Sequence, residues 1–233
     1  CIHDCDFCVV PSAWGRRPFE KPVEHVVEDV RRTRARHVIF IDLNLISHPD
    51  YAKELFAALI PLGIRWYGLS TTRITRDPEL LDLTVRSGCR GLLLGFETLS
   101  HDNLRSSKKG FNDPRNYKDI VKKLHERGIS INGTFVFGLD EDTPEISQRT
   151  AEFVIDAAID LPRFAVATPF PGTTLFKRLE AEGRILTRDF SLYDGQHVVF
   201  QPARMTPEQL IEGHTEVWKR VYSVSSIARR IAS

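Results

Sequence analysis

Three of the four cysteines in this 233-residue chain lie within its first eight residues, as Cys1, Cys5 and Cys8. A tight loop with this spacing can present three sulfurs toward one side, and thiolates are the usual protein ligands of iron–sulfur clusters. The fourth cysteine, Cys89, is far away in the sequence, so the spacing predicts a four-iron cluster with one iron left open. An open iron can bind and activate a small molecule, as open positions do in catalytic metal sites.

A structural zinc site is the alternative interpretation of the same residues. It would use Cys1, Cys5 and Cys8 together with His3 or a distant ligand. Structural zinc sites usually combine two closely spaced pairs of Cys or His ligands, and the sequence offers no second pair. The spacing therefore favours the iron–sulfur cluster.

The motif Cys-x3-Cys-x2-Cys, with Phe7 directly before its last cysteine, resembles the signature of the radical S-adenosylmethionine (SAM) enzymes. The resemblance implies a [4Fe-4S] cluster on Cys1, Cys5 and Cys8, with SAM chelating the fourth iron through its amino and carboxylate groups. One electron would then cleave SAM to methionine and a 5′-deoxyadenosyl radical, which abstracts hydrogen from a substrate. The resemblance also implies a reductant such as flavodoxin or ferredoxin.

Composition indicates a globular protein with no preference for polyanions. There are 32 Lys and Arg residues against 31 Asp and Glu residues, and 42% of the residues are hydrophobic. This balance gives no field that would attract nucleic acid or an anionic membrane, and no run reaches the roughly 18 apolar residues of a membrane span. Crowded cysteines suit a reducing compartment. We therefore expect a soluble cytoplasmic protein with no nucleic-acid partner and no membrane span. The resemblance implies a small-molecule substrate.

The elements that must position these cysteines alternate between apolar strands and amphipathic helices. Helical stripes are expected at residues 23–30, 49–62, 77–88, 113–128 and 144–158. Strands are expected at residues 37–42, 64–70, 91–96, 129–137 and 163–168. The first apolar run suggests a strand covered on both faces. Alternation of this kind implies right-handed βαβ units and a parallel α/β sheet.

The alternation alone fits either a doubly wound sheet or a barrel. The resemblance implies a partial (β/α)6 TIM-like barrel, the radical SAM core, whose first strand would precede Cys1 and is therefore lacking here. After residue 172 the pattern changes to a helix at 173–182, a turn and short strand at 193–200, and a helix opened by a capping box at Thr206. We expect a core domain at residues 1–184 and a C-terminal extension at 185–233 that packs on the barrel.

Polar residues or glycines follow nearly every expected strand. In parallel α/β barrels, the active-site residues lie at these carboxyl ends of the strands. The resemblance implies that several of these positions bind SAM: Asp42 and Asn44 the ammonium, Glu97 the ribose or ammonium, and Ser70 and Arg73 the ribose or carboxylate. It also implies an adenine slot formed by Phe7 and the backbone around Phe137, Gly138 and Thr168.

Each of these residues also has an ordinary structural interpretation. Asp42 can cap a helix, and Glu97 can pair with a basic residue such as Arg73 or Arg90. Tyr67 and Phe135 could line a site for a flat apolar substrate, although packing in the core is the favoured interpretation for both. The sequence leaves the substrate unidentified.

Further motifs resemble the radical SAM enzymes that carry an N-terminal cobalamin-binding domain, among them methyltransferases. They are Phe40-x-Asp42-x-Asn44, Gly95-Phe96-Glu97-Thr98, Gly138-Leu139-Asp140, Thr168-Pro169-x-Pro171-Gly172-Thr173 and Ser191-Leu192-Tyr193-Asp194-Gly195. The resemblance implies cobalamin bound through an upstream domain absent here. Since Met205 is the sole methionine, we expect a fragment of a longer protein. A cobalamin-independent radical SAM enzyme and a non-catalytic metal-binding or iron–sulfur module are the alternatives.

Overall fold

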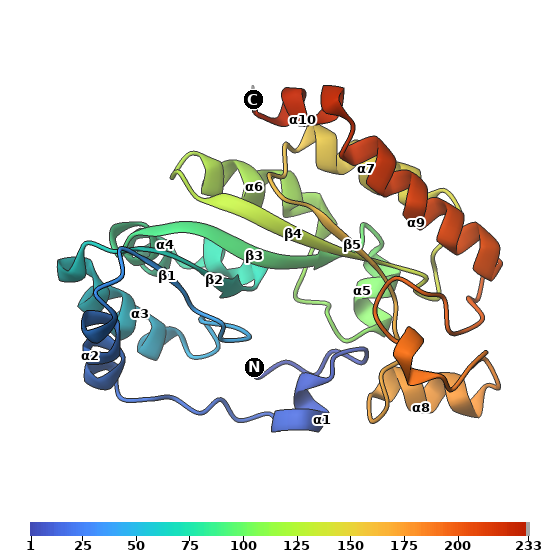
Figure 1. The fold of residues 1–233 in the computed structure, drawn as a ribbon, viewed down its shortest axis with the longest axis horizontal. Coiled ribbons are helices and arrows are strands. Elements are labelled where there is room, and N and C mark those ends of the chain that lie inside the picture. The colour runs from blue at the N-terminus through green and yellow to red at the C-terminus, as the bar shows by residue number, and fades with distance from the viewer. Residues whose placement is uncertain (232–233) are drawn as a thin grey trace.

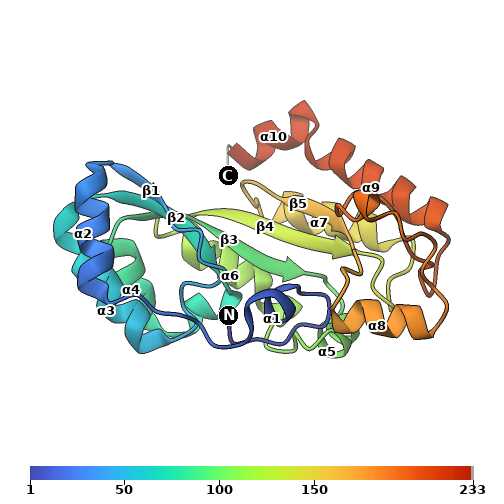
Figure 2. The ribbon, with the colours of Figure 1, turned by 60° about the horizontal axis from the view of Figure 1, so that its bottom comes forward.

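The computed structural model describes residues 1–231 and contains one parallel sheet in which the strands follow each other in sequence order. The strands are β1 (His37–Ile39), β2 (Arg65–Ser70), β3 (Cys89–Glu97), β4 (Ser130–Phe137) and β5 (Arg163–Val166). Each strand pairs in parallel with the next one. The expected partial barrel is confirmed, as a curved sheet that we call the half-barrel (Figures 1 and 2).

Helices connect the strands and group along the sheet. They are α1 (Val10–Trp14), α2 (Val23–Thr33), α3 (Pro49–Leu59), α4 (Pro78–Arg86), α5 (His101–Ser106), α6 (Tyr117–His125), α7 (Ile146–Asp156), α8 (Thr174–Ala181), α9 (Pro207–Val221) and α10 (Val224–Ile231). Figure 1 shows α2 and α3 at the β1 edge and α7 and α9 at the β5 edge. Within residues 1–231, no helix is long and apolar enough to cross a bilayer.

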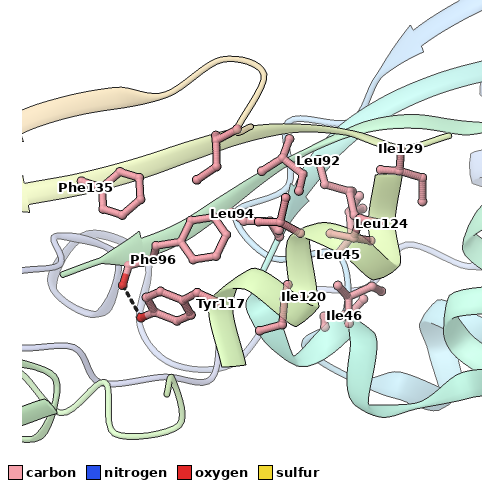
Figure 3. Close-up of a cluster of buried hydrophobic side chains, with 14 of the residues drawn as sticks. Leu45, Ile46, Leu92, Leu94, Phe96, Tyr117, Ile120, Leu124, Ile129 and Phe135 are labelled. Carbon is pink, nitrogen blue, oxygen red and sulfur yellow. Dashed lines mark hydrogen bonds between the residues drawn. The ribbon is translucent and has the colours of Figure 1, made fainter. Parts of the chain in front are cut away.

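The core lies between the sheet and its helices. Leu92, Leu94 and Phe96 alternate along β3 and point toward α6, where Tyr117 and Leu124 meet them (Figure 3). The Tyr117 hydroxyl, buried with its ring, donates to the Phe96 carbonyl oxygen at 2.7 Å. Burying each of these large side chains contributes about 1.5–3 kcal/mol, so this face supplies much of the stability of the half-barrel.

The remaining residues of each strand point to the opposite side of the sheet, which we call the concave face. Ile39, Tyr67, Leu93, Thr134 and Arg163 lie on this face. Successive side chains of a strand point to opposite faces of the sheet, so these residues point away from the helices that cover the core. Tyr67 is 40% exposed, so the expectation that it packs in the core is wrong.

The expectation for Phe135 is confirmed, since its side chain is only 1% exposed. Phe135 lies on the helix-facing side of β4, where its ring stacks on Phe96 at a centroid distance of 5.6 Å. Neighbouring residues of β4, such as Thr134, therefore belong to the concave face.

The first strand differs from its prediction. It ends at Ile39 rather than at residue 42, and the expectation that both of its faces are covered is wrong, because Ile39 is 70% and Ile41 82% exposed. The physical reason is that these residues of β1 and the segment after it alternate with the helix-facing ones and point away from the helices that cover the core. The helix-facing residues, Val38 and Phe40, pack against the core while the alternate residues face outward.

Other departures concern short elements. Residues 10–14 form the short helix α1, which is not among the expected helices. Of the turn and short strand expected at 193–200, the turn is present at residues 193–196, and the strand is reduced to one isolated bridge between Ile185 and Phe200. The capping box is confirmed, because Thr206 and Gln209 exchange their side-chain and backbone hydrogen bonds. The domain boundary at residue 184 stays a prediction.

Asp142 connects the loop after β4 to α5 by hydrogen bonds. Its carboxylate accepts from the backbone N–H groups of Gly138 and Leu139, both at 3.0 Å, and from Asn103 Nδ2 at 2.7 Å. Burial raises the pKa of Asp142 to about 7, and these three hydrogen bonds oppose the shift. The carboxyl group of this tether is therefore expected to change its charge near neutral pH.

We expect stability to fall as the pH rises from about 4 to 7, because the folded state keeps the Asp142 proton over a range where the unfolded chain has lost it. The contribution of this group is at most about 1.4 kcal/mol per pH unit. In Asp142→Asn, which stays neutral, this part of the slope should vanish, as measured by urea unfolding between pH 4 and 8. Asp82→Asn, at an exposed position of α4, should keep the wild-type slope; equal slopes in all three proteins would contradict the prediction.

Candidate functional site

The cysteine loop is held against two elements that follow strand ends. The Asp6 N–H donates to the Ser107 carbonyl oxygen at 3.2 Å, and the Asp6 carbonyl oxygen accepts from the Leu175 N–H at 3.0 Å. Ser107 closes α5, which follows β3, and Leu175 lies in the first turn of α8, which follows β5. These two bonds place the loop at the carboxyl end of the half-barrel, beside α5 and α8 (Figure 2).

The three cysteines of this loop are free and partly buried. The Cys8 N–H donates to the Cys5 carbonyl oxygen at 3.1 Å, which closes a turn between the last two thiols. Among residues 1–231, no three His, Cys, Asp or Glu side chains converge as the ligands of a single metal ion do. A cluster makes a different demand, because each cysteine ligand binds a different iron.

Glu97 closes β3 in a left-handed conformation, with φ at 66°. This conformation is uncommon for residues other than glycine, and it coincides with a shift of register between Gly95 and Glu97 on the β4 side. The carboxylate is buried and forms an ion pair with Lys109, itself buried. Thr134 on β4 donates to the second carboxylate oxygen at 3.4 Å. An added Cβ at Gly95 would meet Glu97 Oε1 at 2.2 Å, so a side chain at this position would have to displace the ion pair.

Asn112 fixes the loop that carries Lys109. Its Nδ2 donates to the Gly95 carbonyl oxygen at 2.8 Å, and its Oδ1 accepts from the Thr72 hydroxyl at 2.6 Å. Sequence reasoning missed both Lys109 and Asn112. The available signal is the polar, glycine-containing stretch 107–113 between an expected strand and an expected helix.

His3 attaches the start of the cysteine loop to the same stretch. Its ring stacks on Phe111 at a centroid distance of 4.1 Å, and Lys109 Nζ lies 5.8 Å from the Phe111 ring centre. Burial lowers the pKa of His3, and the positive charges of Arg73 and Lys109 lower it further. Arg73, an exposed residue in the 3-10 turn after β2, thus lies near the cysteine loop.

The charges around Cys5 both raise and lower the pKa of its thiol. Burial raises the pKa of the Cys5 thiol to about 11, the positive charge of Lys109 opposes that shift, and Cys8 and Glu97 add to it. A thiol must lose its proton to bind a metal. The positive charge of Lys109 therefore favours the thiolate form of Cys5.

Asp42, Asn44 and Ser70 occupy the other predicted strand ends. Asp42 is exposed, and Asn44 is buried with its Oδ1 3.4 Å from the Ile46 N–H. Both line a cavity of about 370 Å³ that also contacts α2 and α3. The Ser70 hydroxyl is buried and donates to the Thr71 carbonyl oxygen at 3.3 Å. Their roles in cofactor binding stay predictions.

The four residues expected around adenine occupy different surroundings. Phe7 is partly buried and packs against the core. Phe137 is fully buried and stacks on Phe164 at 5.9 Å, so it packs in the core. At Gly138, with φ at 90°, an added Cβ would meet the side chain of Leu210 at 2.7 Å. The Thr168 hydroxyl is buried and donates to the Val166 carbonyl oxygen at 3.1 Å.

Comparison with known families divides the chain into two matched parts. Residues 1–154 match the radical SAM superfamily, and residues 173–233 match a domain of unknown function, DUF4070.

Individual relatives agree with this match. The chain is 33% identical to bacteriochlorophyllide d C-12(1)-methyltransferase of Chlorobaculum tepidum, over 99% of this chain and 52% of that protein. It is 25% identical to bacteriochlorophyllide d C-8(2)-methyltransferase of the same organism, over 95% of this chain and 53% of that protein. It thus spans about half the length of these relatives.

Among solved structures, the fold resembles the radical SAM methyltransferase TsrM of Kitasatospora setae with cobalamin and a [4Fe-4S] cluster bound. The TM-score is 0.71 at 21% identity, and the match covers 91% of this chain and 42% of that one.

Replacing Asn112 with alanine should lower the free energy of unfolding by about 1–3 kcal/mol, because Thr72 and the Gly95 carbonyl would each lose a buried partner. Urea unfolding measures this change. Asn116→Ala provides the control at an exposed asparagine, where the expected change is within about 0.5 kcal/mol. Equal losses in the two variants would show that Asn112 does not hold the loop.

Proposed function

This chain belongs to the radical SAM superfamily, and from that premise we propose that Cys1, Cys5 and Cys8 hold a [4Fe-4S] cluster at which SAM is cleaved. The observation that supports it best is the docking of the cysteine loop beside Glu97 and Lys109 at the carboxyl end of the half-barrel. The residues fit such a group, because three free, partly buried thiols on one turn are the donors that iron–sulfur clusters take. When bound, cluster and SAM together supply the one-electron cleavage that yields a 5′-deoxyadenosyl radical.

The side chains of this chain would bind and orient the cofactor. Glu97 presents a buried carboxylate beside Cys5, suited to an ammonium or to ribose hydroxyls, and Thr134 helps to fix its orientation. Lys109 neutralises that carboxylate and favours the thiolate of Cys5. Arg73, near His3, offers a positive charge suited to the carboxylate of an amino acid.

The finer proposal is methyl transfer that depends on cobalamin bound outside residues 1–233. It is supported by the methyltransferase names of the two Chlorobaculum tepidum relatives and by the fold shared with TsrM, whose structure contains cobalamin. The exposed concave face leaves room for a substrate next to the cysteine loop. A flavodoxin or ferredoxin as electron donor stays a prediction.

Removing one ligand should abolish cluster assembly. After anaerobic reconstitution, Cys5→Ala should contain little iron. Cys89→Ala should keep the wild-type iron content, because Cys89 is buried in the core, where its thiol donates to the Gly91 carbonyl oxygen. Iron and sulfide analysis, with electron paramagnetic resonance of the reduced protein, measures this. Unchanged iron in Cys5→Ala, or uptake of zinc but no iron by the wild type, would contradict the proposal.

Glu97→Gln should weaken SAM binding roughly tenfold, because it removes a charged acceptor. It also leaves Lys109 buried and unpaired, which should destabilise the fold by about 3–5 kcal/mol. The double variant Glu97→Gln with Lys109→Gln removes that unpaired charge, so its stability should recover while SAM binding stays weak. The measurement is the SAM-induced change in the resonance spectrum at equal iron content. Wild-type SAM affinity in the double variant would exclude Glu97 as a SAM ligand.

A further inference from the structure

A row of residues crosses the half-barrel beside the candidate site. Gly95 on β3 pairs with Thr134 on β4, and Thr134 pairs with Arg163 on β5. Neighbouring strands are about 4.8 Å apart, so Arg163 lies roughly 10 Å across the sheet from the strand that ends in Glu97. A cavity of about 660 Å³ connects the two ends, since both Glu97 and Arg163 line it.

Arg163 is an exposed cation without an acidic partner. Its side chain forms no ion pair or hydrogen bond with any residue in the range 1–231. Burial raises the pKa of Tyr222, and the positive charges of Arg230 and Arg163 oppose this shift, so the Arg163 guanidinium acts on the Tyr222 hydroxyl. An unpaired guanidinium at the wall of a cavity is suited to a carboxylate or phosphate oxygen of a ligand.

Asn132 adds a second unsatisfied group to the same cavity. Its Oδ1 is buried and has no hydrogen-bond partner among the described residues. Buried polar atoms in native structures are nearly always paired, so this amide oxygen at the cavity wall is suited to accept a hydrogen bond from a ligand. Asn132 lies two residues before Thr134 on β4 and therefore on the same face.

The neighbouring part of the concave face is largely apolar and carries the aromatic ring of Tyr67. Gly91 has no side chain, and an added Cβ there would meet the Ser130 hydroxyl oxygen at 2.6 Å and the Tyr67 ring at 2.8 Å. Leu93 is partly buried in this region, and Ile39 is 70% exposed at the β1 edge. The face therefore offers apolar contact on β1 to β3 and polar contact on β4 and β5.

We propose that the concave face binds a flat, largely apolar substrate that carries an acidic group, with Arg163 as its anchor and Asn132 as a second polar contact. A substrate held at Arg163 extends across the row toward Glu97, where the proposed cofactor would react with its far side. This inference rests on the proposed function for the reaction, but the recognition it describes can be measured without the cluster.

The test uses protoporphyrin IX, a flat ring with two carboxylates, and its dimethyl ester, the same ring without free acids. Binding to the chain is followed by porphyrin fluorescence anisotropy. We expect the diacid to bind about tenfold more tightly than the ester. Arg163→Gln should remove this difference, Arg163→Lys should keep part of it, and Asn132→Leu should weaken the binding of both probes. The control is Arg149→Gln, an exposed arginine on α7 without an ion pair among the described residues, which should behave as the wild type.

Equal binding of diacid and ester by the wild type would overturn the proposal without any variant. Equal losses in Arg163→Gln and Arg149→Gln would also overturn it, since they would indicate a general charge effect. Cluster assembly and the SAM-induced spectral change are measured in parallel on Arg163→Gln and should match the wild type. A wild type that lacks these signals but prefers the diacid would contradict the proposed function and support this inference.

Discussion

The buried ion pair between Glu97 and Lys109 is the interaction on which the candidate site depends. It joins the end of β3 to the loop that follows α5, and its two charges act on Cys5 in opposite directions. Removing two charges from water is costly, and such a pair is tolerated only when its geometry and its further hydrogen bonds are good. Thr134 supplies one of these bonds, and Asn112 holds the loop that brings Lys109 into place. A pair of this kind is weak evidence for stability and stronger evidence for a specific local arrangement.

The half-barrel separates stability from chemistry by using the two faces of its strands differently. The helix-facing residues, such as Leu94 and Phe96, are fully buried and supply the hydrophobic energy. The alternate residues, such as Tyr67 and Arg163, are exposed and contribute less to folding. Because the side-chain period of a strand is two, one short sequence can specify both faces. This arrangement leaves the concave face free to vary with the substrate while the fold is kept.

The relatives place this arrangement in a wider context. The family match covers residues 1–154, and the fold similarity to TsrM persists at 21% sequence identity. A fold that persists at so low an identity is consistent with stability that rests on apolar pattern and volume more than on particular side chains. Residues such as Arg163 and Asn132, which face the cavity and not the core, are where we expect this chain's own specificity to lie.

The sequence by itself determined the elements and the family. Apolar stripes gave the five strands and their intervening helices within a few residues, Thr206 marked a helix start, and the cysteine motif indicated the cofactor chemistry. These features are local, because periodicity and capping depend on neighbours within a few positions in the chain. Tertiary structure alone decided which strand-end residues meet. It paired Glu97 with Lys109, placed Phe137 in the core and exposed Ile41 next to the edge strand β1. Within residues 1–231 it also left Arg163 without an ion pair and Asn132 Oδ1 without a hydrogen bond, both at the wall of one cavity. Such contacts join residues far apart in the sequence, and they follow from how the sheet curves and from where the loops cross it, which no local pattern encodes.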